Sequence, residues 1–415
     1  MLFLSSVSLV LVSLPVLLGA AVGAASPACA PLPTPLSQPS DLPIISHLPD
    51  PFSFRLSDSR VEDRADWECR RAELKTLVQE YLWGYLPDHA QEVVHTSRTG
   101  SNITVTVSVA DRSATFVANI TFPPTPEDDD NELDSTSDRH VPVVISAGTY
   151  LAPVNITPFL ESGVAVVQFD VNDVGNDSWT RVGEFWELYP DRNIGLMGVW
   201  AWAEHRILDA LELVVPELDF SRVGVVGCSR YGKTALAAAI FDERITLALP
   251  LSSGAEGIGP WRYYYESQGV AEKIENITTK YGYWSTTELW KFDNVTGNST
   301  RVPFDAHELV SLVAPRAILW DEGQEDWWTN PEGSVSVVFG AAKVVFDALG
   351  VGDRVGVHVR HPPDDLHCGL AAYSLVQPFL QKTFFGTPTT VSFDDISPFP
   401  PHPEAYPWST DVPQL

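Results

Sequence analysis

The chain has 415 residues, with 54 acidic and 26 basic side chains and a formal net charge of −28 at pH 7. A balance this acidic argues against a basic face that binds nucleic acid or an anionic membrane. The length permits two domains, but no linker separates the strand-like segments described below, so we expect one main domain.

The N-terminus reads as a targeting segment. Residues 1–25 are apolar and end in small residues, which predicts a secretory signal peptide, with a membrane anchor as the alternative. The Pro-rich residues 26–50 predict an extended arm. No later stretch is long and apolar enough to span a bilayer.

Secretion gives meaning to the sequons and cysteines. Seven sequons predict N-glycosylation, at Asn102, Asn119, Asn155, Asn176, Asn276, Asn294 and Asn298. An even number of cysteines in an oxidising compartment predicts two disulfides, with buried free thiols as the alternative. These cysteines are Cys29, Cys69, Cys228 and Cys368.

The periodicity after the arm predicts an α/β fold. A helix is expected at about 66–83, and the alternating runs 103–110 and 115–122 predict a hairpin. Apolar runs then alternate with helical segments, which predicts a mostly parallel sheet covered on both faces by helices. The strand-like runs are 141–146, 164–169, 223–226, 247–251, 316–319 and 355–359, and the helical segments are 194–214, 231–241, 304–312, 332–349 and 370–384.

Two segments break this alternation. The acidic run 127–132 lies between Pro-rich and Ser-rich residues and predicts a solvated loop. Residues 254–302 are rich in Trp, Tyr, Asn and Thr, and are expected to roof or rim the functional site or to form a glycan-bearing loop.

Residues 227–233 (Gly-Cys-Ser-Arg-Tyr-Gly-Lys) are the most informative motif. They follow an apolar strand-like run and precede a helix-prone one, which predicts a strand, a tight turn and a helix with Ser229 at the apex. Such a turn exposes the serine Oγ and aims the first helix amides at a neighbouring oxyanion. Ser229 is therefore the candidate nucleophile, although the spacing is G-x-S-x-x-G rather than G-x-S-x-G.

Partners for the serine follow later strand-like runs. Asp326 follows the run 316–319, and His367 follows the run 355–359. The order serine, acid, histidine is that of the α/β-hydrolase triad. If this triad forms, Cys228 and Cys368 are neighbours, which predicts a Cys228–Cys368 bridge and leaves Cys29 with Cys69.

The motifs together resemble those of the glucuronoyl esterases of carbohydrate esterase family 15. The resemblance covers roughly residues 50–386 and rests on residues 227–233, the His-Cys pair at 367–368, Pro-Phe-Asp-Ala-His at 303–307, Ala-Pro-Arg-Ala at 314–317 and Asp-Trp-Glu-Cys-Arg-Arg at 66–71. It implies an α/β-hydrolase sandwich over 51–386 and no metal or cofactor. The C-terminal tail, 387–415, shows no cellulose-binding module.

The resemblance assigns roles position by position. It implies Ser229 as nucleophile and His367 as general base, with the two neighbouring cysteines bridged. Arg230 matches an arginine that stabilises the oxyanion, and Lys233 matches a lysine that contacts sugar hydroxyls. Trp328 matches a tryptophan that packs on the glucuronate ring, with Trp327 as its alternative, and Glu275 matches a residue that contacts uronate hydroxyls.

One position departs from the family pattern. Many members carry the triad acid as a glutamate where this chain has Ser252, which cannot orient an imidazole by charge. Some relatives place the acid after the later strand, where Asp326 stands. Glu325 and Asp321 are the alternatives, and Glu256 lies too far beyond the missing position.

The implied activity is hydrolysis of the ester between 4-O-methyl-glucuronic acid of xylan and lignin alcohols. The partner is then plant cell-wall polysaccharide, and the protein is expected to be a secreted monomer that binds neither nucleic acid nor membrane. The alternatives are an acetyl xylan or other carbohydrate esterase, or a catalytically silent carbohydrate-binding relative.

Overall fold

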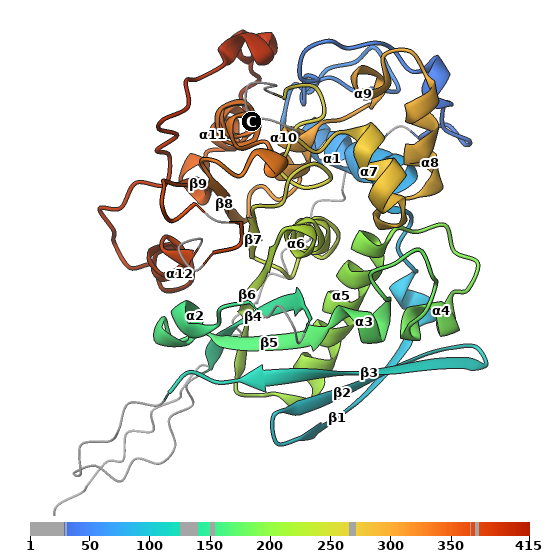
Figure 1. Cartoon of the computed structure of the whole chain (residues 1–415), viewed down its shortest axis with the longest axis vertical. Helices are drawn as coiled ribbons and strands as arrows, with labels where there is room; N and C mark the ends of the chain where they lie inside the picture. The colour runs from blue at the N-terminus through green and yellow to red at the C-terminus, as the bar shows by residue number, and fades with distance from the viewer. Residues whose placement is uncertain are drawn as a thin grey trace, which may run out of the picture.

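The computed structural model describes residues 29, 31–124, 140–149, 154–264, 271–365, 367–369 and 373–415. The predicted signal peptide, 1–25, and the acidic run, 127–132, lie outside the described residues. Within them, one nine-stranded sheet forms the middle layer, in the order β1-β2-β3-β5-β4-β6-β7-β8-β9 (Figure 1).

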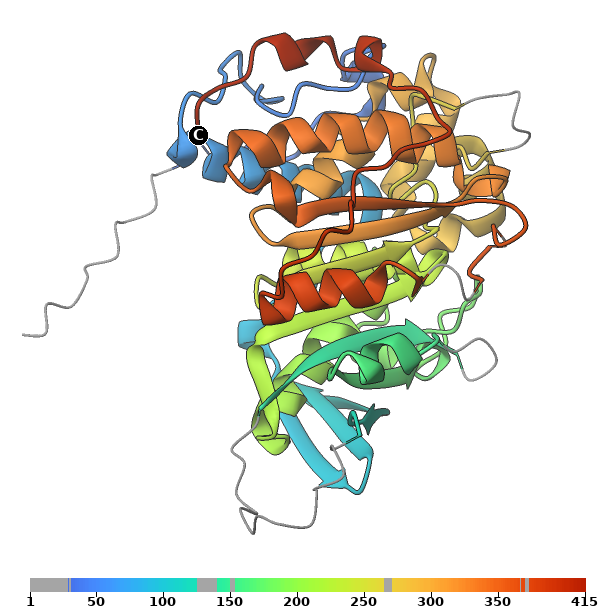
Figure 2. The ribbon, with the colours of Figure 1, turned by 90° about the vertical axis from the view of Figure 1, so that its left-hand side faces the viewer.

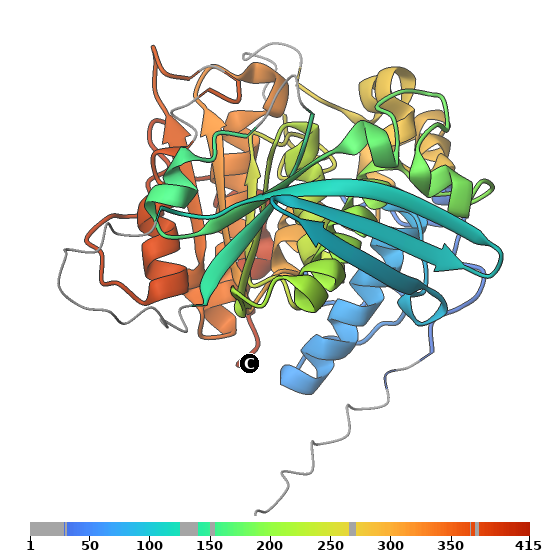
Figure 3. The ribbon, with the colours of Figure 1, turned by 90° about the horizontal axis from the view of Figure 1, so that it is seen from below.

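The strands confirm the predicted alternation. The first four in that order pair antiparallel, and those from β5 to β9 pair parallel. Seen from below, β1–β3 cross the direction of the parallel strands, as the twist of a large sheet requires (Figure 3). The strands are β1 (Val93–Thr99), β2 (Asn102–Val109), β3 (Arg112–Thr121), β4 (Val141–Gly148), β5 (Ala165–Asp170), β6 (Leu218–Cys228), β7 (Leu247–Leu251), β8 (Ala317–Gly323) and β9 (Val355–Arg360).

Helices cover both faces of the sheet. One face packs on α1 (Arg64–Val78), α5 (Leu196–Val214), α6 (Arg230–Phe241), α10 (Ala306–Ser311) and α11 (Phe339–Ala348). The other packs on α2 (Thr157–Glu161) and α12 (Val376–Phe385). The arrangement confirms the predicted three-layer α/β-hydrolase sandwich.

Shorter helices complete the chain. The predicted helix 66–83 ends in a π-helical turn, Gln79–Trp83, and the predicted helix 332–349 begins as one, Gly333–Val338. The remaining short α-helices are α3 (Val171–Val174), α4 (Glu184–Leu188), α7 (Ile274–Tyr281), α8 (Thr287–Trp290) and α9 (Asn298–Arg301). The 3-10 turns are Pro39–Asp41, His89–Gln91, Gly282–Trp284, Lys291–Asn294, Trp327–Thr329, Gly352–Arg354, Pro403–Ala405 and Pro407–Thr410.

The two ends of the described chain lie together. The segment after α12 crosses the outside of the molecule and reaches the N-terminal arm (Figure 2). The Leu48 amide donates to the Ala405 carbonyl at 2.9 Å, and the Trp408 indole donates to the Leu48 carbonyl at 3.0 Å. A Cys29–Cys69 disulfide, as predicted, ties the arm to α1. The segment 387–415 therefore packs against the domain.

No helix in the described part of the chain is both long and apolar enough to cross a bilayer.

Candidate active site

Ser229 stands on the sharp turn between β6 and α6. Its φ of 59° and ψ of −128° are unusual for a residue with a side chain, and its amide donates to the Leu251 carbonyl at 2.9 Å. A Cβ on Gly227 would lie 2.2 Å from the Tyr231 carbonyl oxygen, and one on Gly232 would lie 2.9 Å from that of Leu251. The two glycines of G-x-S-x-x-G therefore let the chain approach itself closely enough to form the turn.

A disulfide brings the histidine loop to this turn. The predicted Cys228–Cys368 bridge is present, with the two Cα atoms 5.8 Å apart. Because Ser229 and His367 are each the chain neighbour of a bridged cysteine, and neighbouring Cα atoms lie 3.8 Å apart, their Cα atoms are within about 13 Å. The loop also passes close to the end of β8, where a Cβ on Gly323 would lie 2.3 Å from the Asp365 carbonyl oxygen.

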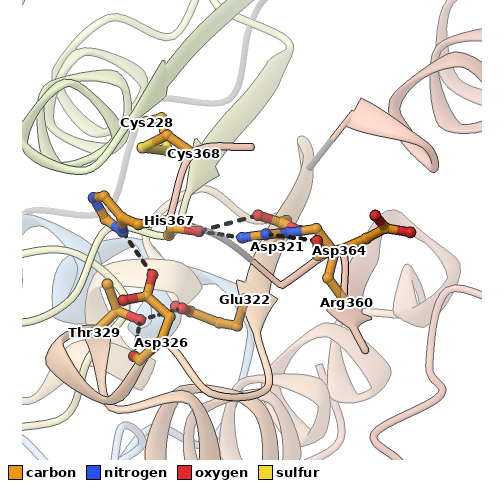
Figure 4. The surroundings of a disulfide bond; sticks show 10 residues. Cys228, Asp321, Glu322, Asp326, Thr329, Arg360, Asp364, His367 and Cys368 are labelled. Atoms are coloured by element: carbon orange, nitrogen blue, oxygen red, sulfur yellow. Dashed lines mark hydrogen bonds and ion pairs between the residues drawn. A yellow bond between two sulfur atoms is a disulfide. The ribbon is translucent and has the colours of Figure 1, made fainter. Parts of the chain in front are cut away.

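Asp326 orients the imidazole of His367. Its Oδ2 lies 2.6 Å from His367 Nδ1, and its side chain is only 8% exposed, whereas that of His367 is 40% exposed. Since a carboxylate accepts, Nδ1–H donates and the other ring nitrogen is left as an acceptor, pointing away from Asp326 (Figure 4). This pair has the geometry of the acid and base of a serine hydrolase.

The alternative carboxylates stand in different surroundings. Asp321 is buried, accepts from Arg360 Nε at 2.6 Å, and accepts from the Ser252 hydroxyl at 3.1 Å. Glu325 is exposed. Burial raises the pKa of Glu256 to about 8, with its charged neighbours being Lys233 and Glu272.

Arg230 lies directly after the serine, at the first position of α6. Its guanidinium forms an ion pair with Asp177 and lies 5.3 Å from the centroid of the Trp284 ring. The Trp284 indole also donates to Asp177, at 3.1 Å. Burial lowers the pKa of Arg230, but the charge of Asp177 outweighs it and the net shift is upward. Asp177 and Trp284 therefore hold the positive side chain of the residue that follows the nucleophile in the chain.

Lys233 lies one turn further along α6 and is buried. Its ammonium donates to the carbonyls of Ser253 and Ala255 and forms an ion pair with Glu272 at 2.7 Å. These three partners engage all three ammonium protons, so in this arrangement Lys233 has no proton left to donate to a sugar hydroxyl.

Glu272 connects Lys233 to the turn Trp327–Thr329. The Trp328 indole donates to Glu272 Oε1 at 2.9 Å, and the Glu272 amide donates to the Trp328 carbonyl at 3.0 Å. Trp328 is therefore held by Glu272, while Trp327 is 37% exposed. Glu275 stands outside this arrangement: it is exposed and accepts from the Asn298 amide.

Three residues of the site, Asp177, Trp284 and Glu272, could not be singled out from the sequence. Asp177 lies inside the Asn176 sequon, which drew attention to glycosylation instead. Trp284 belongs to the aromatic segment expected at the rim, and Glu272 lies three residues before the predicted Glu275. The sequence indicates the segments in which these residues lie but not the residues themselves, because loops and short turns have no periodicity.

The serine stands on a strained strand–helix turn, and a disulfide joins this turn to a loop whose histidine is held by a carboxylate. These features define a serine hydrolase of the α/β-hydrolase class. The family model described as "Glucuronyl esterase, fungi" matches residues 105–350. The chain belongs to this family, whose members are carboxylic ester hydrolases.

Relatives and solved structures agree with this assignment. The chain is 34% identical over 344 residues to 4-O-methyl-glucuronoyl methylesterase 1 of Wolfiporia cocos, a match covering 79% of each chain. It is similar to a carbohydrate esterase family 15 glucuronoyl esterase from Caldicellulosiruptor kristjansonii, with a TM-score of 0.78, 34% identity and coverage of 90% and 99% of the two chains. A glucuronoyl esterase mutant from Sporotrichum thermophile in complex with methyl 4-O-methyl-beta-D-glucopyranuronate has a TM-score of 0.76 at 26% identity, covering 91% and 99%.

Proposed function

We propose that this protein hydrolyses the ester between 4-O-methyl-glucuronic acid of glucuronoxylan and lignin alcohols, with Ser229, His367 and Asp326 as its triad. The observation that supports the proposal is the 2.6 Å hydrogen bond from His367 to Asp326. The loop that contains His367 is joined to the nucleophile turn by the Cys228–Cys368 disulfide. The uronate ester in the Sporotrichum thermophile complex supports the acyl group.

The chemistry divides into two displacements. His367 accepts the proton of the Ser229 hydroxyl while Oγ bonds to the ester carbonyl carbon, and Asp326 stabilises the resulting imidazolium. The tetrahedral oxyanion is met by the Arg230 amide and guanidinium. Collapse breaks the bond to the alcohol, which takes the proton from His367. Water then gives a proton to His367 and bonds to the acyl carbon. Collapse breaks the bond from that carbon to Ser229 Oγ, which takes the proton back from His367 as glucuronic acid leaves.

The polar groups next to the serine suit a uronate better than a plain acyl group. Arg230 supplies charge at the reacting carbonyl, and Trp328 offers an aromatic face to sugar C–H groups. We assign the contact with uronate hydroxyls to Glu272 rather than Glu275, because Glu272 is fixed at the site by its bonds to Lys233 and Trp328. Lys233 then acts by holding Glu272.

We infer secretion as the setting of this activity. Two disulfides favour an oxidising compartment, and the predicted signal peptide, 1–25, agrees with it. The net charge of −28 keeps such a protein soluble as a monomer and away from anionic membranes and nucleic acid. We also propose the division into an arm, 26–50, a catalytic domain, 51–386, and a C-terminal segment, 387–415.

The test compares benzyl glucuronate with p-nitrophenyl acetate, in the wild type and in Ser229→Ala. The proposal predicts rapid hydrolysis of the uronate ester, slow hydrolysis of the acetate, and loss of uronate ester hydrolysis in the variant. A preference for the acetate would indicate a different carbohydrate esterase. Inactivity toward both would favour a silent carbohydrate-binding protein.

A further inference from the structure

Glu322 is a carboxyl group beneath the active site that the mechanism above does not use. It stands on β8, its side chain is 0% exposed, and its Oε2 lies 2.7 Å from the Thr329 hydroxyl. The same hydroxyl lies 2.9 Å from the main-chain carbonyl oxygen of Asp326. Figure 4 shows Glu322 and Thr329 beside Asp326, on the side away from the disulfide.

The Thr329 hydroxyl has one proton and two neighbouring oxygens. The Asp326 carbonyl can only accept, so the hydroxyl must donate to it if that bond forms. The Glu322 oxygen then has to be the donor in the other contact, and a carboxyl donates only when it is protonated. If Glu322 were ionised, the hydroxyl could donate to only one of its two neighbours, and the Asp326 carbonyl would keep only the bond from the Thr329 amide, at 3.0 Å.

The charges around Glu322 favour the same protonation state. Burial raises the pKa of Glu322 well above its usual range, and the charges of Asp326 and Asp321 raise it further; donation from the Thr329 hydroxyl to an ionised Glu322 would lower it, but by less than burial raises it. The Ser334 hydroxyl also faces the carboxyl. The nearby Arg360 is engaged with Asp321, so ionising Glu322 would bury a negative charge beside two others.

We propose that Glu322 is a neutral hydrogen-bond donor that positions the triad acid, through the chain Glu322 O–H to Thr329 Oγ1 and Thr329 O–H to the Asp326 carbonyl. The inference rests on the proposed role of Asp326. Glu322 is a positioning residue, because it acts on the main chain of the turn Trp327–Thr329 and touches neither substrate nor His367. The same turn contains Trp328, so the protonated Glu322 would position both Asp326 and the Trp328 ring.

The first experiment compares Glu322→Leu with Glu322→Gln on benzyl glucuronate. Leucine removes the donor, and we expect kcat to fall about 10- to 100-fold, because a small misplacement of a catalytic group costs this much. The glutamine amide donates to Thr329 as the protonated acid does, so it should restore kcat to within about threefold of the wild type. Circular dichroism and thermal melts check that both variants fold.

Thr329 provides the matched pair. Thr329→Val should lose as much activity as Glu322→Leu, and the double variant should lose no more than either, since both break one chain. Thr329→Ser should retain activity. The proposal is overturned if Glu322→Gln is as impaired as Glu322→Leu, or if Glu322→Leu lowers the melting temperature while leaving kcat and its pH profile unchanged.

A spectroscopic measurement separates this proposal from the proposed function. The infrared difference spectrum of wild type minus Glu322→Gln at pH 7 should contain the carbonyl band of a protonated carboxylic acid. A carboxylate band in its place would overturn the proposal. The measurement needs no turnover, so it reports on Glu322 whatever ester the enzyme cleaves.

Discussion

Replacing Asp326 by asparagine removes the charge behind the imidazole while keeping the shape of the side chain. At the 2.6 Å separation of His367 Nδ1 and Asp326 Oδ2, an effective dielectric constant of about 20 gives roughly 6 kcal/mol of attraction for the imidazolium. The His367 side chain is 40% exposed, so water screens part of this. A loss of about 4 kcal/mol corresponds to about a 1,000-fold fall in kcat/KM.

The assay is kcat/KM on benzyl glucuronate at neutral pH, with folding checked by circular dichroism. Glu325→Gln is the matched control, because it removes an exposed charge one residue away and should keep full activity. Ser252→Ala should also stay near wild-type activity, although losing the buried bond to Asp321 should cost about 1–2 kcal/mol of stability. Asp326→Asn within threefold of wild type, or a larger loss in Ser252→Ala, would refute the placement of the acid.

Three further predictions concern the nucleophile turn, the disulfide beside it and the pH dependence of stability. Gly227→Ala should lower kcat on benzyl glucuronate by about 100-fold or more, because the new Cβ would lie 2.2 Å from the Tyr231 carbonyl oxygen and displace the nucleophile turn. Wild-type kinetics would contradict this. Replacing Cys228 and Cys368 by serine should lower the unfolding free energy by about 5 kcal/mol, given the separation of 140 residues, as measured by denaturant titration; an unchanged midpoint would contradict it. Glu243, which follows α6, forms ion pairs with Lys75 at 2.8 Å and Arg71 at 3.0 Å. Burial raises the pKa of Glu243 and lowers that of Lys75, but the two ion pairs outweigh burial and lower the pKa of Glu243 to about 2. Glu243→Gln should therefore destabilise the fold near pH 6, with the difference from wild type shrinking as the pH falls from about 4.5 toward 2; a constant difference would contradict it.

The sequence predicts the parallel part of the fold because those strands are buried on both faces. Each apolar run from 141 to 359 became a strand of the sheet. The edge strand β1, Val93–Thr99, was not predicted, because its side chains alternate between exposed and half-buried and its sequence is largely polar. An edge strand depends on its partner for pairing, and hydrophobicity gives it little signal.

The triad candidates could be predicted because each lies beyond the end of a parallel strand: Ser229 follows β6 (Leu218–Cys228), Asp326 follows β8 (Ala317–Gly323) and His367 follows β9 (Val355–Arg360). Carboxyl ends of parallel strands meet at one edge of the sheet, which agrees with the bond from His367 to Asp326 and with the disulfide that joins the His367 loop to the Ser229 turn. Asp177 and Glu272 could not be predicted in this way. They lie in loops and short turns, whose path is set by tertiary contacts such as those with Arg230 and Lys233.

Peptide mapping after a rapid quench with benzyl glucuronate identifies the residue that carries the acyl group. We predict a glucuronoyl adduct on the peptide that contains Ser229 in the wild type, and no adduct in Ser229→Ala. An adduct on another residue, or undiminished ester hydrolysis by Ser229→Ala, would contradict the account.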